Sequence, residues 1–360
     1  MIMNLINNSI SNASILLEKK LSNFKLDTIE LSDYNRRYFG SLIKNKQSLN
    51  LNLDKYSYLL KLSLSKYEYN INSKPIFLDY GSGHGMMTLL AKQSGLFSKV
   101  VYSDIFEQSA IDAKKIASKL NLESDFYIVG DIHEIVKFSD ETLLKFNIMT
   151  SYDVLEHIYN IEDFIKNLKF IFDSKFSFVM GSGANPLNPL ISIRLRKLHL
   201  YFENHDREVV FGRKSTDTTM SLRKQRELII KDYYFKNEVI PKEDELEFLI
   251  RNTRGLIDKD IEMYLSDYLA SGIFGYSPDD PTNTCDAFTG NWFERLMNPY
   301  ELRNKFHTNF DNISVNFGYY YSLITNKYFI PKFVINSVMR LLPSKFAIKL
   351  SPFYIIHGIN

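Results

Sequence analysis

Residues 76–85 read IFLDYGSGHG, and this stretch decides the fold of the chain. An apolar run from Ile76 to Leu78 ends in an acid, Asp79, and three alternating glycines follow it. The next residues, MMTLLAKQSG, have the apolar spacing of a helix and end on a glycine. A strand that turns on glycines and re-enters a helix brings backbone N–H groups against whatever occupies the turn. The stretch therefore predicts a strand, a ligand-binding turn and a helix.

Four further apolar runs follow at nearly regular intervals, at 100–102, 126–129, 146–150 and in KFSFVMGSG from Lys175. The first three are followed by acids, which are Asp104, Asp131 and Asp153. Helical patterns such as 107–120 and 161–172 lie between the runs. This alternation predicts an α/β fold with a doubly wound, mostly parallel sheet. Ligands of such sheets bind outside the carboxyl ends of the strands, where these acids gather.

The segment 76–183 resembles the catalytic core of the class I S-adenosylmethionine-dependent methyltransferases, in the type 11/12-like group that includes the ubiquinone- and menaquinone-type enzymes. LDYGSGHG is similar to their first motif, acid-x-G-x-G-x-G. Asp104, GDIHEI and YDVLEHI stand where the family has its ribose-binding acid, its adenine-contacting segment and its fourth motif. The resemblance implies a Rossmann-like, seven-stranded sheet whose last two strands form an antiparallel hairpin, in NISVNFGYYYS and SPFYIIHGI.

The resemblance also implies that S-adenosylmethionine is the cofactor and that the strand ends hold it. Asp79 then binds the methionyl ammonium, directly or through water, and Asp104 binds the ribose hydroxyls. Gly81 and Gly83 allow close approach of the methionyl and ribose portions, and Asp131 accepts from the adenine amino group. The remaining expected contacts are Gly85, Asp153 and, against the adenine, Ile105 and Ile132.

A dinucleotide dehydrogenase is the natural alternative, because it too uses an acid after its second strand. Its fingerprint is G-x-G-x-x-G. Here Met86 stands at the last position of that fingerprint, and the glycine comes one residue earlier, at Gly85. The spacing therefore favours the methyltransferase.

Methyl transfer to a hydroxyl needs the acceptor placed in line with the methyl group and a base that takes its proton. His157 follows the fourth strand, and an unperturbed imidazole titrates near working pH, so His157 is the predicted base. His133 is the second candidate. Alternatively, Glu156 and His157 shape the pocket or bind the cofactor. We predict no metal site.

The motifs divide the chain into four predicted parts. These are a helical lead-in at 1–72, the cofactor-binding core at 73–190, a helical substrate-recognition insertion at 191–298, and the completion of the core sheet at 299–360. An insertion of this length must hold structure of its own. The lead-in either packs over the cofactor cleft or covers the edge of the sheet.

The insertion offers two candidate contacts to an acceptor, His205 and Trp292. His205 precedes Asp206, and such a pair is either a base or a solvated helix end. Trp292, the only tryptophan, ends the polar loop PTNTCDAFTGNW. Polar groups beside an aromatic ring suit a sugar, whereas the alternative for Trp292 is a buried anchor.

Composition limits the partners and the compartment. A net charge of +2 argues against a nucleic-acid partner. The single cysteine excludes an intramolecular disulfide and a cysteine zinc cluster, which fits a reducing cytoplasm. We expect no signal peptide and no membrane span, because neither pattern is present. The sequence does not indicate an oligomeric state.

The tail is unusual in charge. From Asn312 to Asn360 there is no acid, whereas five bases stand among apolar residues: Lys327, Lys332, Arg340, Lys345 and Lys349. The helical segment 327–349 therefore favours peripheral contact with the inner face of a membrane. The alternative is a core-packed helix with a solvated basic face.

The sequence thus predicts an O-methyltransferase that acts on the hydroxyl of a small molecule or saccharide, such as a bacterial surface-glycan precursor. Methylation of a quinone-like or lipid acceptor is one alternative, and a non-catalytic cofactor-binding protein of the same fold is another. A nucleic-acid base methylase is disfavoured, because NPLNPL at 185–190 follows the fifth strand and lacks the aromatic residue of the N-P-P-[YF] motif.

Overall fold

The computed structural model describes residues 2–207, 218–278, 280–321 and 329–360. The chain forms two compact units. The first contains Met1–Leu155, Glu162–Ser182 and Pro299–Asn360, and the second contains Glu156–Ile161 and Gly183–Asn298. Residues 208–217 and 279 of the predicted insertion, and Lys327 of the predicted membrane segment, lie outside the described residues.

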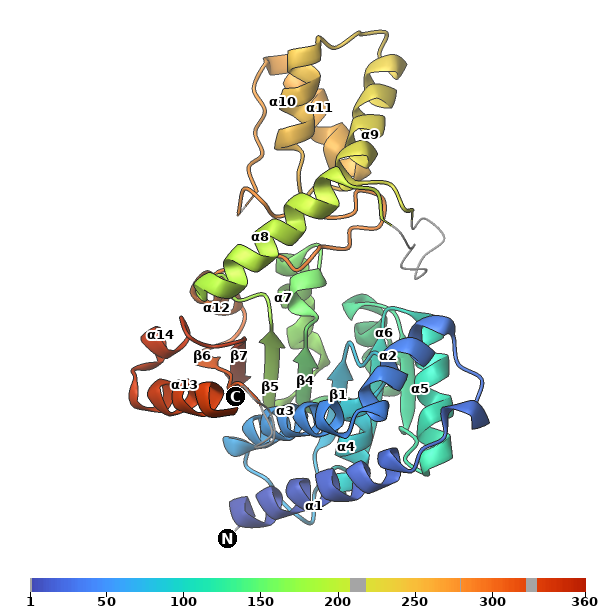
Figure 1. The fold of residues 1–360 in the computed structure, drawn as a ribbon, viewed down its shortest axis with the longest axis vertical. Helices are drawn as coiled ribbons and strands as arrows, with labels where there is room; N and C mark the ends of the chain where they lie inside the picture. The colour runs from blue at the N-terminus through green and yellow to red at the C-terminus, as the bar shows by residue number, and fades with distance from the viewer. Residues whose placement is uncertain (1, 208–217, 279, 322–328) are drawn as a thin grey trace. The chain divides into compact units, whose positions relative to one another are not determined.

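Within the described residues, seven strands form one sheet in the first unit, in the order β3-β2-β1-β4-β5-β7-β6 (Figure 1). The strands are β1 Ile76–Tyr80, β2 Lys99–Asp104, β3 Phe126–Val129, β4 Phe146–Tyr152, β5 Phe172–Ser182, β6 Asn312–Phe317 and β7 Tyr354–Ile359. β1 to β5 are parallel, and β7 is antiparallel to both β5 and β6. The predicted doubly wound sheet with a terminal hairpin is confirmed. The chain reverses its winding between β1 and β4, which is where such sheets bind ligands.

The helices that link the parallel strands are α4 Met86–Ser94, α5 Glu107–Leu120, α6 Ile132–Thr142 and α7 Ile161–Leu168. The helix predicted at 107–120 is confirmed by α5. The helix predicted at 161–172 ends earlier, because Lys169–Ile171 is a 3-10 turn and β5 begins at Phe172. The Phe172 ring stacks on Phe176 and Phe178 of the same strand, and this packing holds it in the sheet.

Three N-terminal helices cover one face of this sheet: α1 Ile2–Ser22, α2 Asp33–Lys44 and α3 Lys46–Ser65. α3 packs on β4 and β5, and α1 packs on α3 and α4 (Figure 1). Their apolar side chains, Leu53 and Leu60 among them, join the core of the sheet. α2 and α3 are separate helices, because Asn45 ends α2 and caps α3 by accepting from the Gln47 N–H at 2.9 Å.

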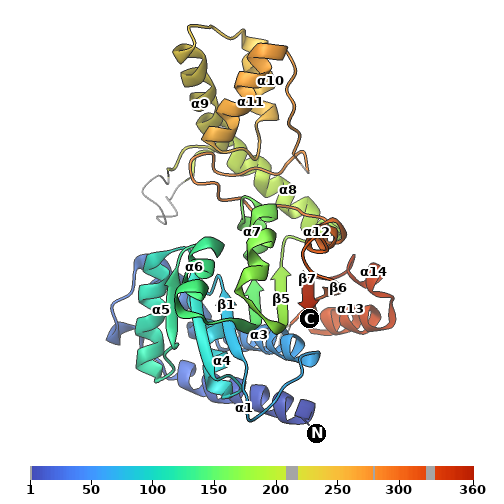
Figure 2. The same ribbon diagram turned by 180° about the vertical axis from the view of Figure 1, so that it is seen from behind.

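Near the C-terminus the first unit holds α12 Pro299–Phe306, α13 Phe329–Leu341 and α14 Ser344–Ala347. α12 packs on β6 and β7, and α14 contacts β6 and α13 (Figure 2). The long helix expected between the last two strands is therefore two helices, which separate at Pro343, the N-cap of α14.

The described part of the second unit is helical: α8 Pro189–Asn204, α9 Leu222–Lys236, α10 Glu243–Asn252 and α11 Asp258–Ser271. α9 packs against the other three helices. α10 ends at Asn252, and Gly255 follows with a φ of +81°. Across the described ranges of both units, no helix is long and apolar enough to cross a membrane.

Candidate functional site

The glycine turn after β1 has a backbone that a ligand can approach closely. Gly81, Gly83 and Gly85 have φ values of +73°, +54° and +80°, in the left-handed region that favours glycine. A Cβ on Gly81 would lie 2.3 Å from the Cγ2 atom of Val154, so this position has no room for a side chain. A Cβ on Gly83 would meet nothing within 4 Å. The backbone at Gly83 therefore faces open space that a ligand can enter.

Asp104, at the end of β2, is held against this turn. Its Oδ2 accepts from the Gly83 N–H at 2.8 Å, and its Oδ1 accepts from the Phe106 N–H at 2.9 Å. The Tyr102 hydroxyl fixes the same turn by donating to the Gly83 carbonyl at 2.6 Å. Burial raises the pKa of Asp104, and the two backbone bonds oppose that shift. Each carboxylate oxygen keeps a lone pair that can accept from a ribose hydroxyl.

Asp79, the acid near the end of β1, is 3% exposed. Its Oδ2 accepts from the Thr88 hydroxyl of α4 at 2.6 Å. Burial raises the pKa of Asp79 to about 6, against the lowering effect of bonds from Thr88 and Ser82. A buried carboxylate is poorly solvated, so a nearby cation stabilises its charged form more than it stabilises that of an exposed carboxylate. Asp79 therefore suits an ammonium group such as that of a methionyl moiety.

The predicted adenine contacts differ in exposure. Asp131 is exposed and caps α6, with its Oδ1 accepting from the His133 N–H at 2.9 Å. Ile105 is 49% exposed, which leaves it available to an adenine ring. Ile132 is only 3% exposed and packs inside the protein. The His133 Nε2 lies 2.7 Å from the Asp163 Oδ2 in a surface pair.

Asp153 follows β4 in an unusual backbone conformation. Its φ is +55°, a strained value for a residue other than glycine, and strain of this kind concentrates at functional sites. Its N–H donates to the Gly181 carbonyl at 2.9 Å, which fixes the turn to β5. Because Asp79 of β1 pairs with Thr150 of β4, Asp153 emerges beside the glycine turn.

Lys55 of α3 reaches the same strand end, and no sequence motif predicted it. Its Nζ lies 3.8 Å from the centre of the Tyr152 ring and 5.0 Å from that of Tyr56. The Tyr56 and Tyr152 rings meet edge to face, with centroids 6.4 Å apart. Burial lowers the pKa of Lys55, and the Asp153 carboxylate partly opposes that shift. The end of β4 thus carries a cation enclosed by two aromatic rings.

The N-terminal lead-in covers the glycine turn through α2. The Tyr38 and Phe39 rings lie 5.5 Å and 5.9 Å from the His84 ring, which belongs to the turn. Burial lowers the pKa of His84 to about 4, and the positive charge of Lys55 adds to this effect. His84 is therefore neutral at working pH. Asp112 of α5 ties α2 in place by accepting from the Asn35 side chain at 2.9 Å.

His157, the predicted base, belongs to the second unit. Its Nδ1 donates to the Trp292 carbonyl at 2.8 Å, which leaves the lone pair of the neutral ring on Nε2. Nε2 lies 4.0 Å from the Oε1 of Glu294, an acid with a φ of +53° that the sequence did not single out. Nε2 is therefore the ring nitrogen that can accept a proton from a hydroxyl.

Trp292 is buried, so the prediction that its ring contacts an acceptor does not agree with the packing. The side chain is 4% exposed, and the Arg295 guanidinium lies 4.4 Å from the ring centre. A Cβ on Gly255 would lie 2.3 Å from the ring, so Gly255 and Trp292 pack in direct contact. Because neither face of the ring is open to a sugar, the alternative of a buried anchor describes Trp292.

The His205 and Asp206 side chains form hydrogen bonds with different partners. The His205 Nδ1 lies 3.1 Å from the Tyr201 carbonyl, and its ring stacks on Tyr201 at 4.6 Å. Asp206 accepts from the Ser221 N–H at 2.9 Å and from the Lys224 ammonium at 2.7 Å. Asp206 therefore orders the start of α9, and the pair forms a helix end rather than a base.

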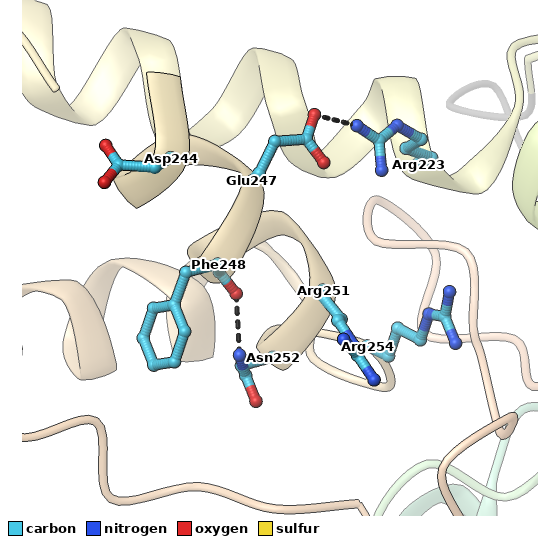
Figure 3. Close-up of a pocket in the computed structure, with 7 residues that line it drawn as sticks. All are labelled: Arg223, Asp244, Glu247, Phe248, Arg251, Asn252 and Arg254. Atoms are coloured by element: carbon cyan, nitrogen blue, oxygen red, sulfur yellow. Dashed lines mark hydrogen bonds and ion pairs between the residues drawn. The ribbon is translucent and has the colours of Figure 1, made fainter. Parts of the chain in front are cut away.

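A hollow of about 550 Å³ also lies in the second unit, among α9 and α10 (Figure 3). Glu247 and Arg223 form an ion pair at its edge. The lining residues are Arg223, Asp244, Glu247, Phe248, Arg251, Asn252 and Arg254. They combine basic, acidic and aromatic side chains, so this hollow holds groups that can bind a polar molecule. Within the described residues, no cluster of His, Cys, Asp and Glu could hold a metal ion.

Comparison with known proteins finds a matching domain family. Residues 78–172 match the family model of a methyltransferase domain. A search of curated proteins finds no significant match. Similar solved structures include an S-adenosylmethionine-dependent methyltransferase from Clostridium acetobutylicum, 15% identical over 38% of this chain and 53% of that chain, with a TM-score of 0.32. Another, from Agrobacterium tumefaciens, is 14% identical over 37% and 44%, with a TM-score of 0.30. The StiE O-MT structure is 17% identical over 50% and 61%, with a TM-score of 0.32.

The matches span less than two thirds of the length of each of these structures. Residues 78–172 thus match a methyltransferase domain, and the seven-stranded sheet that contains them has the class I, Rossmann-like fold. S-adenosylmethionine is the cofactor of this class, and the buried acids at the ends of β1 and β2 fit its ammonium and its ribose.

Proposed function

We propose that this protein transfers the methyl group of S-adenosylmethionine to a hydroxyl of a small molecule or saccharide. The observation that carries methyl transfer is the hydrogen bond from the Gly83 N–H to the Asp104 carboxylate. This bond holds an acid that can bind a diol beside a glycine turn that is open to a ligand. The bound cofactor would supply an electrophilic methyl on a sulfur leaving group. The protein must then orient the acceptor, exclude water and accept the hydroxyl proton.

Within this proposal Asp79 binds the ammonium of the cofactor and Asp104 binds its ribose. His157 accepts the proton at Nε2, supported by the 2.8 Å bond that fixes its Nδ1–H on the Trp292 carbonyl. Glu294 lies 4.0 Å from that nitrogen. A neutral hydroxyl acceptor needs such a base, whereas an acceptor that is already an anion does not.

The acceptor class rests on the second unit, whose hollow carries both charged and aromatic groups. We propose a glycan precursor in the cytoplasm, a compartment in which the buried thiol of Cys285 stays reduced. A lipid-borne acceptor is the second candidate, favoured by the exposed apolar side chains of α13.

Cofactor binding is tested by calorimetry with S-adenosylhomocysteine. Asp104→Ala should lose about 2–4 kcal/mol of binding free energy, because the ribose hydroxyls lose a charged acceptor. Asp140→Ala is the matched control, since Asp140 is an exposed acid of α6 that pairs with Lys145. Wild type that binds NAD and not S-adenosylhomocysteine would overturn the proposal.

Turnover is tested separately by following S-adenosylhomocysteine release with sugar nucleotides, simple polyols and quinols as acceptors. Release with a sugar nucleotide or polyol supports the proposed class. Release only with quinols points to the alternative acceptor. Tight cofactor binding without release on any acceptor would favour a non-catalytic protein.

A further inference from the structure

One face of α13 exposes a row of large apolar side chains. Their spacing of three and four residues places them on the same side of the helix. The exposed fractions are 72% for Ile330, 56% for Phe333, 51% for Val334, 41% for Val338 and 87% for Leu341. We call these five residues the apolar face. Solitary exposed apolar residues are ordinary, but a contiguous row marks a surface that something covers.

The opposite side of α13 faces the protein and carries polar groups together with Met339, which is fully buried. The Lys332 Nζ donates to the Tyr321 carbonyl at 3.2 Å. Asn336 bonds the Tyr320 backbone twice, accepting from its N–H at 2.9 Å and donating to its carbonyl at 2.7 Å. These bonds fix the rotation of the helix. A helix that lies on a protein surface in water normally turns most of its large apolar side chains inward, whereas α13 exposes five of them.

The neighbouring helix α14 continues this surface with mixed chemistry. Phe346 is 46% exposed, and the Lys345 and Lys349 ammonium groups lie 5.1 Å and 6.0 Å from its ring centre. Arg340, at the end of α13, is also exposed. No Asp or Glu occurs from Asn312 to the C-terminus at Asn360, so the basic charges meet no acid within this segment.

We propose that α13 and α14 dock this protein on the surface of an anionic lipid bilayer. The apolar face enters the boundary between head groups and acyl chains, and Arg340, Lys345 and Lys349 bind lipid phosphates. Charge selects this occupant. A second copy of the chain would bring these basic groups against each other, whereas an anionic membrane complements them. The inference concerns location and stands independently of the methyl acceptor.

The test is co-sedimentation of the full chain with vesicles of phosphatidylcholine alone or mixed with phosphatidylglycerol. Wild type should bind the mixed vesicles and lose most of that binding in high salt, because screening weakens the phosphate contacts. The double variant Phe333→Glu, Leu341→Glu should bind at least about tenfold more weakly, since it places two charges in the apolar layer. The triple variant Arg340→Gln, Lys345→Gln, Lys349→Gln should lose the preference for phosphatidylglycerol.

Phe235→Glu is the matched control, because Phe235 is an even more exposed aromatic than Phe333, at 82%, on α9 of the other unit. It should bind vesicles as wild type does. Unchanged S-adenosylhomocysteine affinity or an unchanged thermal midpoint in each variant shows that the fold survives. Equal vesicle binding by wild type and the double variant would overturn the proposal. So would a concentration-dependent dimer that binds no vesicles and that Phe333→Glu disrupts.

Discussion

The Nζ atom of Lys55 lies 3.8 Å from the centre of the Tyr152 ring, so an ammonium from α3 rests on the aromatic side chain that ends β4. The next residue, Asp153, has a left-handed backbone, and its charge acts on Lys55. The N-terminal lead-in therefore does more than cover an edge of the sheet. It places a cation at the strand ends that hold the candidate cofactor site.

The first prediction concerns the stability cost of Lys55. Burial lowers its pKa from the ordinary lysine value of about 10.4. Between the lowered pKa and that value, the unfolded chain binds more protons than the folded one, so stability rises with pH across this window. At neutral pH the buried ammonium costs stability. Lys55→Met should therefore melt at a higher temperature than wild type at about pH 7.

The advantage of Lys55→Met should shrink as pH approaches about 10, where both chains carry a neutral side chain at this position. Thermal melting of the two proteins across the alkaline range measures the difference directly. Lys145→Met is the control, because Lys145 is an exposed lysine in a surface ion pair. A constant difference at every pH would show that packing and not charge distinguishes Lys55→Met from wild type.

The second prediction is that Asp79 lowers the stability of the fold and strengthens cofactor binding. Its folded pKa of about 6 exceeds the ordinary value of about 3.9, so the folded state binds the extra proton. Stability is therefore lost as pH rises from about 4 to about 6. Asp79→Asn should gain up to about 1–3 kcal/mol at neutral pH, since the amide keeps an acceptor for Thr88 without a buried charge. Its affinity for S-adenosylhomocysteine should fall sharply.

A proton should also leave Asp79 when the ligand binds. An ammonium beside the carboxylate favours its charged form, so binding at about pH 6 should release a proton that is not released at about pH 8. Calorimetry in buffers of different ionisation enthalpy counts this proton. Asp79→Asn should not show it. Equal release by the variant would place the titrating group elsewhere.

The sequence predicted the sheet well because its signals are local. Apolar runs, the acids after them and the glycine turn each occupy a few neighbouring residues, and α5 and β3 begin and end where the periodicity indicated. The contact between Lys55 and Tyr152 has no such signal, since the two residues lie on separate elements far apart in the sequence. A lysine in a leucine-rich helix predicts only a solvated position.

The sequence also could not decide which side chains are buried. The loop around Trp292 has the composition of a sugar site, but Gly255 and Arg295 close over the ring. Gly255 could have served as a signal, because a glycine inside a helix-like segment suggests a helix end. For α13, the pattern indicated an amphipathic helix. The rotation that turns its apolar side outward depends on bonds from Asn336 to the Tyr320 backbone.

The third prediction follows from the burial of Trp292. Trp292→Ala should lose about 3–5 kcal/mol of unfolding free energy, because it leaves a large cavity in the second unit. Gly255→Ala should also be destabilising, since its Cβ would lie 2.3 Å from the ring at a φ of +81°. Denaturant unfolding measures both. In the double variant the two losses should not add, because removing the ring makes room for the new methyl. A Trp292→Ala protein of unchanged stability would revive its role as an acceptor contact.

The last prediction separates His157 as a base from His157 as a structural residue. If Nε2 takes the hydroxyl proton, the single-turnover rate of His157→Ala should fall by about 10²–10⁴, with cofactor affinity unchanged. Glu294→Gln keeps the shape of its partner but removes the charge 4.0 Å from Nε2, so it should lower the rate less. His307→Ala is the control, since His307 is an exposed histidine that follows α12, and it should keep the full rate. A His157→Ala protein that keeps its rate while binding the cofactor poorly would instead assign His157 to the wall of the site.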